Sequence, residues 1–125
     1  MKILGFRHPV FISAPNVNLT VRRGVKWAAQ KGNEVEVRET TRGKVFGTAT
    51  ITATRVVKFD DLTDADLHCN HDPECRTVAG LFDRMRRAYA GAGSHTETYL
   101  FDKKEIVTLV FFEINFCTQC GHALE

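Results

Sequence analysis

Two runs of alternating apolar and polar residues dominate the middle of this 125-residue chain. From residue 34 to residue 57 the sequence reads EVEVRETTRGKVFGTATITATRVV. β-Branched residues alternate with polar residues on both sides of a Thr-Thr-Arg-Gly stretch, which is typical of a turn. The pattern predicts a β-hairpin or meander, with Val35 and Val37 on one side of its first strand and Glu34, Glu36 and Arg38 on the other.

Other stretches predict further strands. The run EIVTLVFFEINF, at residues 105–116, is dense in β-branched and aromatic residues and is predicted to be a central strand. KILGF near the start of the chain and NLTVR from Asn18 onward are shorter candidates. The chain therefore contains enough strand signals for one small sheet or barrel.

Helical signals lie between these strands. Thr63 and Asp66 have the spacing of a capping box that opens a short helical turn, and Asp72-Pro73 is a typical helix start. The residues GAGSH, at 91–95, interrupt the helical pattern. Strands around one main helix predict an α+β domain. The apolar face of that helix consists of Val78, Leu81, Phe82, Met85 and Tyr89.

Composition indicates one globular domain, residues 1–125, because 43% of the residues are apolar and 26% are charged. No apolar stretch approaches the roughly 20 residues of a membrane span, and Arg7, His8 and Pro9 interrupt the N-terminal apolar run. We therefore expect a cytoplasmic protein with reduced thiols. The formal net charge of +2 says little about partners, so a nucleic-acid interface must be argued from charge clusters.

Four motifs occur in an order that resembles the ASCH domain, a branch of the PUA-like small β-barrels. The resemblance covers roughly residues 2–114 and implies a partly open barrel of five to six strands with one main helix and a short helical turn. It also implies a cleft beside the helix for RNA or a nucleotide-like ligand. The motifs are Thr20-Val21-Arg22, Gly32-Asn33-Glu34-Val35, Phe59-Asp60-Asp61-Leu62-Thr63 and Val107-Thr108-Leu109-Val110.

The same resemblance raises the question of catalysis, since some small bacterial ASCH proteins are amidohydrolases that use a Lys, a Thr and a Glu on N4-acylated cytidine. Thr20 matches the nucleophile position and Arg22 the family's arginine, but the lysine position is Val17. Valine cannot accept the proton of a threonine hydroxyl, so the hydrolase set is incomplete. The glutamate has no clear counterpart after Thr63, in a region that contains His68, Asn70, His71 and Glu74. In a second register, Gly24-Val25-Lys26 corresponds to the family's G-x-K. This set is also incomplete, because Ala29 then replaces the family's following Thr or Glu and Lys31 replaces its Arg.

Basic residues cluster in two places. Arg22, Arg23, Lys26 and Lys31 surround Trp27, and a second group lies on the predicted helix. Positive charge beside an aromatic plane suits a phosphate and a stacked base, and both groups on one side would line a basic cleft. The alternative is a solvated helix face with an Asp83–Arg87 pair and a Trp27 that belongs to the core. The predicted ligand-binding residues are Thr20, Arg22, Arg23, Lys26, Trp27, Arg84 and Arg87.

The four cysteines fall into two short clusters, HCNHDPEC at residues 68–75 and FCTQCGH at residues 116–122. Such pairing predicts a structural zinc site that joins the two segments as a C-terminal zinc knuckle. Its predicted ligands are Cys69, Cys75, Cys117 and Cys120, with His71 as a substitute for Cys69. The alternatives are a redox-active C-x-x-C, unrelated buried thiols, or a three-ligand catalytic zinc on His71, Cys117 and Cys120 with Glu74 as acid/base.

The leading interpretation is an RNA- or nucleotide-binding ASCH-like domain with a basic cleft and a structural Zn²⁺ ion. The first alternative is an amidohydrolase that acts on N4-acylated cytidine-type nucleosides through Thr20. The second is a protein-interaction adaptor whose zinc end is the contact surface.

Overall fold

The computed structural model describes residues 2–6, 12, 17–40, 42–90, 101–117 and 122–123, with backbone alone at 88–90, 116–117 and 122–123. Its strands are β1 (Lys2–Phe6), β2 (Asn18–Arg23), β3 (Glu34–Glu39), β4 (Val45–Lys58), β5 (Ile106–Cys117) and β6 (His122–Ala123). Its helices are the 3₁₀ turns η2 (Phe59–Asp61), η3 (Asp64–Leu67) and η4 (Pro73–Cys75), and the α-helix α1 (Val78–Ala90).

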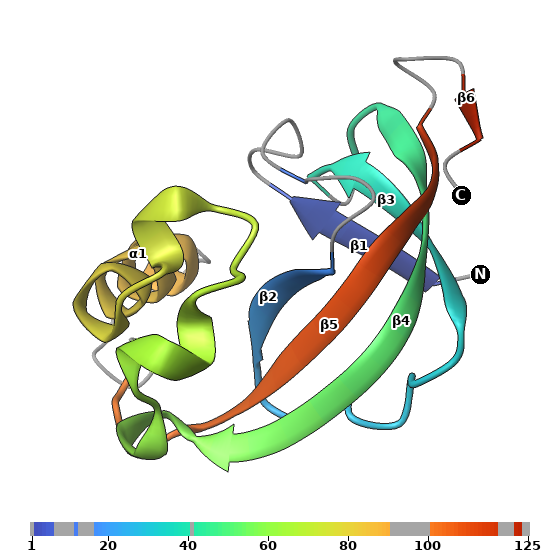
Figure 1. The fold of residues 1–125 in the computed structure, drawn as a ribbon. Helices are drawn as coiled ribbons and strands as arrows, with labels where there is room; N and C mark the ends of the chain where they lie inside the picture. Colours follow the sequence, from blue (N-terminus) through green and yellow to red (C-terminus); the bar gives the residue numbers. More distant parts are fainter. Residues whose placement is uncertain are drawn as a thin grey trace.

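The strands form one curled sheet in the order β1-β3-β4-β5-β2, with β6 paired to β5 (Figure 1). β1 runs parallel to β3, and the other neighbours along the path are antiparallel. The predicted hairpin is confirmed as β3 and β4, and β5 is confirmed as an internal strand. β1 and β2 stand at the two ends of this path, so the closure of the half-barrel depends on what lies between them.

The curl of the sheet has a local cause in the 14-residue strand β4. Its pairing with β5 shifts register between Thr48 and Ala49 and again between Ile51 and Ala53. Such bulges bend a strand and increase its twist. The loop before β3 is closed by Gly32, which has a φ of 86° that favours glycine and donates its amide to the carbonyl of Ile51 at 2.7 Å.

Alternation along β5 produces two cores on opposite faces of the sheet. Val110, Phe112 and Ile114 point into the inner core, inside the curl, while Val107 and Leu109 join the outer core. The outer core is closed by α1 through Leu81 and Met85, and by the 3₁₀ turns. A strand buried on both faces explains the dense apolar composition of this stretch.

The segment before α1 differs from the prediction. The capping box of Thr63 and Asp66 is confirmed at η3, but Asp72-Pro73 begins the 3₁₀ turn η4, not the main helix. There are three short helical turns in this segment where one was predicted, and α1 starts at Val78, whose amide donates to Asp64 at 2.7 Å.

The predicted apolar face of the main helix is confirmed at four positions. Leu81 and Met85 are buried, and Val78 and Phe82 are partly buried. The side chain of Tyr89 and the GAGSH stretch lie outside what the structure describes. Within the described residues, no helix is both long and apolar enough to cross a membrane.

Candidate nucleic-acid interface

Two side chains connect the strands that end the sheet. Arg22 of β2 donates from Nη2 to the carbonyl of Gly5 in β1 at 2.7 Å, and its guanidinium lies 4.9 Å from the ring centroid of Phe6. His71 contacts the same Phe6 ring edge-on at 4.7 Å. We call this place, formed by Gly5, Phe6, Leu19, Arg22 and His71, the β1–β2 junction.

His71 is held at the junction through the backbone of β2. Its amide donates to the carbonyl of Leu19 at 3.0 Å, and its ring Nδ1 lies 3.1 Å from the same oxygen. Because a carbonyl can only accept, Nδ1 carries the hydrogen. The imidazole also lies 6.5 Å from Phe112, so three rings from three parts of the chain gather here.

Thr20 lies on the same face of β2 as Arg22. Leu19 and Val21 belong to the outer core, so alternation turns Thr20 and Arg22 to the inner side of the sheet. Thr20 is 5% exposed. Val17, at the lysine position of the hydrolases, is 42% exposed. Thr20 and Arg22 thus lie on one face of β2, whereas the position that corresponds to the lysine is a valine.

The junction is built largely from a part of the chain that lacks carboxylates. Residues 1–33 contain six Lys or Arg residues and no Asp or Glu; the first is Glu34. Both end strands and the loop after β2 fall within this stretch. A phosphate that approaches the junction therefore meets no carboxylate from either end strand.

Trp27 does not serve as an exposed stacking platform. Its ring is 6% exposed and packs in the inner core, while Lys2 Nζ lies 5.8 Å from the ring centroid. This burial matches the alternative of a core role for Trp27, and a ligand role for this side chain stays a prediction. Lys26 beside it is exposed and forms no ion pair with any described residue, so its charge remains available.

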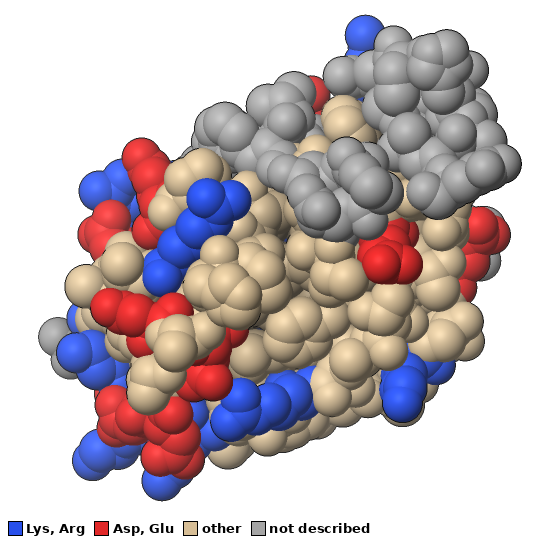
Figure 2. Space-filling view, in the orientation of Figure 1, with Lys and Arg blue, Asp and Glu red and all other residues tan. Residues whose placement is uncertain are grey.

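The helix arginines do not form one basic surface with the loop. Arg84 pairs with Asp72 at 3.5 Å and also with Glu74, and Arg87 pairs with Asp83 at 2.9 Å. Arg23 pairs with Glu105 through two hydrogen bonds, of 2.6 and 3.0 Å. Figure 2 shows Lys or Arg atoms interleaved with Asp or Glu atoms over the helical end of the molecule. The basic cleft predicted from two joined groups is thus not found among the described residues.

The predicted zinc site is only partly covered by the structure. Cys69 and Cys75 are free thiols at the outer core, and burial, followed by the nearby charge of Asp72, raises the pKa of Cys75 to about 11. Cys120 and the side chain of Cys117 lie outside the described residues. No group of three or more His, Cys, Asp or Glu side chains that could hold a metal occurs in the part that is described. The zinc site therefore stays a prediction.

The pairing of β2 with β5 determines how far Cys69 lies from Cys117, and so whether both can bind the same zinc ion. The carbonyl of Cys69 accepts from Leu19, and Leu19 pairs with Phe111 in β5. Cys117 follows Phe111 by six residues, so its backbone lies roughly 20 Å further along the strand. One ion with bonds of about 2.3 Å cannot bridge that distance, so a four-cysteine site requires a different path for the end of the chain.

Sequence reasoning missed the aromatic part of this interface. Phe6 and Phe112 were treated as strand residues, and His71 was considered only as a metal ligand. The sequence feature that points to this region is the lack of acidic residues in the first 33 positions, since the first carboxylate is Glu34.

Comparisons with known proteins support the fold. A crystal structure of an ASCH domain from Lactobacillus crispatus JV V101 superposes on the chain with a TM-score of 0.54 and 14% sequence identity. The match covers 78% of this chain and 63% of the other, so the chain spans less than two thirds of that protein. No protein-family model and no curated protein matches the sequence. The chain has an ASCH-like fold.

Proposed function

We propose that this ASCH-like domain binds single-stranded RNA or a nucleotide-like ligand at the β1–β2 junction. The observation that carries the proposal is the position of Arg22, whose guanidinium lies over Phe6 where the two end strands meet. A guanidinium suits a phosphate because arginine can pair with it in bidentate fashion, and here the Phe6 ring, which is 3% exposed, supports the guanidinium from the core side. The resemblance to ASCH domains, which implies a ligand of this class, points the same way.

The surrounding charges support a phosphate path on the same side. Lys2, the first residue of β1, has its Nζ 5.8 Å from the Trp27 ring centroid, and the exposed Lys26 precedes Trp27 in the loop after β2. Neither lysine has an ion-pair partner among the described residues. Arg22 lies between them and His71 along β2. Binding along this line would release counterions, so affinity would fall steeply with salt.

Titration of a short fluorescein-labelled single-stranded RNA at several salt concentrations tests the proposal by fluorescence anisotropy. We expect an Arg22→Ala, Lys26→Ala double variant to bind at least roughly tenfold more weakly, with a salt slope lower by about 1.4, because each lost contact to a single strand removes about 0.7. An Arg87→Ala, Lys104→Ala variant removes the same charge on the other side and is the matched control. Thermal unfolding of each variant verifies that it folds.

Two outcomes would contradict the proposal. One is binding by the wild-type protein that does not depend on salt. The other is an equal loss of affinity in the control variant. A protein-interaction adaptor, in contrast, would show no RNA binding and would keep its partner when Arg22 is replaced.

A second candidate, an amidohydrolase for N4-acylated cytidine-type nucleosides, is favoured by the placement of Thr20. Its hydroxyl lies on the face that carries Arg22, which is the arrangement that the hydrolase resemblance implies. Release of cytidine from N4-acetylcytidine, abolished by Thr20→Ala and retained by Thr20→Ser, would support it. No release by the wild-type protein would exclude this substrate, in agreement with the missing base at Val17.

The predicted structural zinc is tested separately by metal analysis of the purified protein. The prediction requires about one zinc ion per chain, because a structural site keeps its ion through purification. A content well below that would refute it. Cys69→Ser and Cys117→Ser variants would tell whether both clusters share the ion, since either substitution should then lower the content.

A further inference from the structure

Residues 69–71 add a short bridge to the outer edge of β2. Leu19 donates its amide to Cys69 at 3.0 Å and accepts the amide of His71 at 3.0 Å, which makes an isolated bridge between Leu19 and Asn70. The bridge lies next to Thr20 and determines where the His71 ring meets Phe6. A contact that holds residues 70–72 in place therefore also holds the His71 ring in place at the junction.

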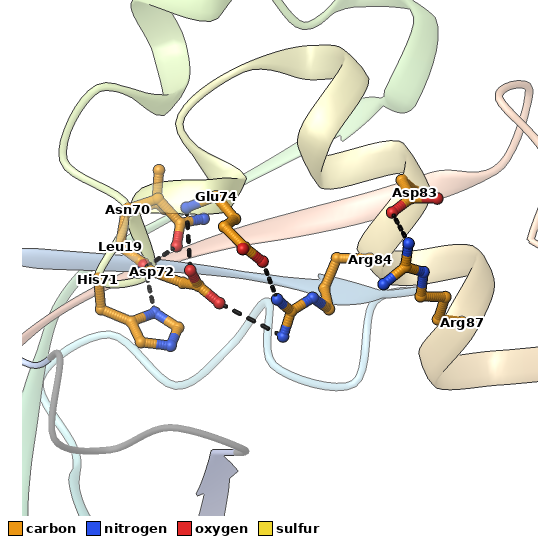
Figure 3. Close-up of polar contacts among 8 residues, drawn as sticks. All are labelled: Leu19, Asn70, His71, Asp72, Glu74, Asp83, Arg84 and Arg87. Carbon is orange, nitrogen blue, oxygen red and sulfur yellow. Dashed lines mark hydrogen bonds and ion pairs between the residues drawn. The ribbon is translucent and has the colours of Figure 1, made fainter.

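Asp72 connects this bridge to α1. It is 4% exposed, its Oδ1 accepts the amide of Glu74 at 2.9 Å, and its Oδ2 lies 3.5 Å from Arg84 Nη1 (Figure 3). A carboxylate this deeply buried is costly unless it has a charged partner. Arg84 supplies that partner and at the same time pairs with Glu74.

Arg84 and Arg87 differ although both are arginines of one helix. The side chain of Arg84 is 19% exposed and its guanidinium is shared between two carboxylates of the pre-helix segment. The side chain of Arg87 is 68% exposed and, among the described residues, its ion pair is with Asp83 of its own helix. In Figure 3 the Arg84 side chain extends toward Asp72 and Glu74, while Arg87 lies apart from that group.

We propose that Arg84 is a positioning residue of the ligand site and not a phosphate contact. Through Asp72 it holds residues 70–72 on β2, and so keeps His71 against Phe6 at the junction. The proposal rests on the function proposed above, because it assigns His71 a place beside the ligand.

A double-mutant cycle with the same labelled RNA distinguishes the two roles. We expect Arg84→Met and Asp72→Asn each to weaken binding roughly 3- to 10-fold without changing the salt slope. The double variant should bind RNA about as well as the single variant with the lower affinity, because both substitutions break the same contact. Arg84→Lys keeps the charge but not the fork that reaches both carboxylates, so we expect it to weaken binding as well.

A second measurement does not depend on RNA. Hydrogen exchange of the Leu19 and His71 amides, followed by NMR, reports whether the bridge to β2 is closed. We expect exchange of these two amides to accelerate in Arg84→Met and Asp72→Asn and to be unchanged in Arg87→Met. Amides of β4 and β5 should keep their protection in all three variants, which separates a local opening from global unfolding.

Three results would overturn the proposal: a salt slope that falls by about 0.7 in Arg84→Met, additive losses in the cycle, or unchanged exchange at Leu19 and His71. If the wild-type protein does not bind RNA, the proposed function fails and the role of Arg84 toward a ligand fails with it. The exchange measurement would still decide whether Arg84 holds His71 in place.

Discussion

The two sides of the sheet use the same basic residue in opposite ways. Residues 1–33, which include both end strands, contain six Lys or Arg and no carboxylate in the sequence. On the helix side, residues 59–87 carry seven Asp or Glu and four Lys or Arg. Arg22 therefore bonds to the Gly5 carbonyl and covers Phe6, whereas Arg84 and Arg87 pair with carboxylates.

This difference shows that a cluster of arginines on a helix is not by itself a nucleic-acid surface. An arginine within reach of a carboxylate is paired with it and adds structure, and this holds for Arg84 and Arg87 and also for Arg23, which lies in the acid-free stretch but reaches Glu105. The predictions that follow challenge this contrast, beginning with the largest expected effect.

Neighbouring residues of β5 compare the cores on the two sides. Phe112 is fully buried in the inner core and contacts Phe6, while Phe111 is only partly buried against the outer core. We expect Phe112→Ala to lower the free energy of unfolding by about 3–5 kcal/mol, as is usual for a buried phenylalanine. Phe111→Ala should cost clearly less in the same urea titrations. Equal costs would mean that the inner face is not the better packed one.

Single lysines compare the charges on the two sides. Replacing Lys26 by Ala should weaken binding of the labelled RNA roughly 3- to 10-fold and lower the salt slope by about 0.7. Lys104→Ala, which removes a charge that is also exposed, from the segment before β5, should leave both quantities within error. If the two variants behave alike, RNA attraction depends on net charge alone and the contrast between the sides fails.

Ion pairs on the helix side should contribute to stability according to their burial. Arg23 binds Glu105 through two bonds, with both side chains 27% exposed, and Arg23→Met is expected to cost about 1 kcal/mol. Arg87→Met breaks an exposed pair within one helix and should cost no more than about 0.5 kcal/mol. Chemical denaturation measures both, and a reversed order would contradict this ranking.

The smallest effect concerns Asp66, whose pKa is lowered by the hydrogen bond from the Thr63 amide and then by Arg55. The folded state therefore binds this proton less readily than the unfolded chain, so the contribution is present above the unfolded pKa of about 3.9 and lost as pH falls further. We expect Asp66→Asn to lower the Tm slightly at pH 7 and to have no effect near pH 2. Asp60→Asn, at an exposed position of η2, is the control. A difference that persists at pH 2 would contradict this cause.

Much of the fold followed from local pattern, because the hairpin strands alternate with a period of two, the main helix has a period of 3.6 and β5 is a dense apolar run. The hairpin of β3 and β4, the capping box at Thr63 and the internal position of β5 were predicted correctly. The start of α1 was predicted wrongly, because Asp72-Pro73 fits a 3₁₀ turn as well as an α-helix and only tertiary contacts choose between them.

The candidate site was less predictable than the fold. The motif predicts Thr20 and Arg22, which share one face of β2. The other predicted ligand residues have structural partners that the sequence did not reveal: Trp27 is buried in the inner core, and Arg84 and Arg87 pair with carboxylates. Side-chain charge is visible in a sequence, whereas its neutralisation depends on partners such as Asp72 and Arg84, which are twelve residues apart.

By itself, the sequence determined the strands, the main helix and the acid-free character of the first 33 residues, since these depend on local pattern and composition. Only the tertiary structure decided that β1 and β2 meet through Arg22 and His71, and which arginines are neutralised. The physical reason is that those contacts join residues far apart in the chain, from Gly5 to Arg22 and from Leu19 to His71, at positions that no local period specifies.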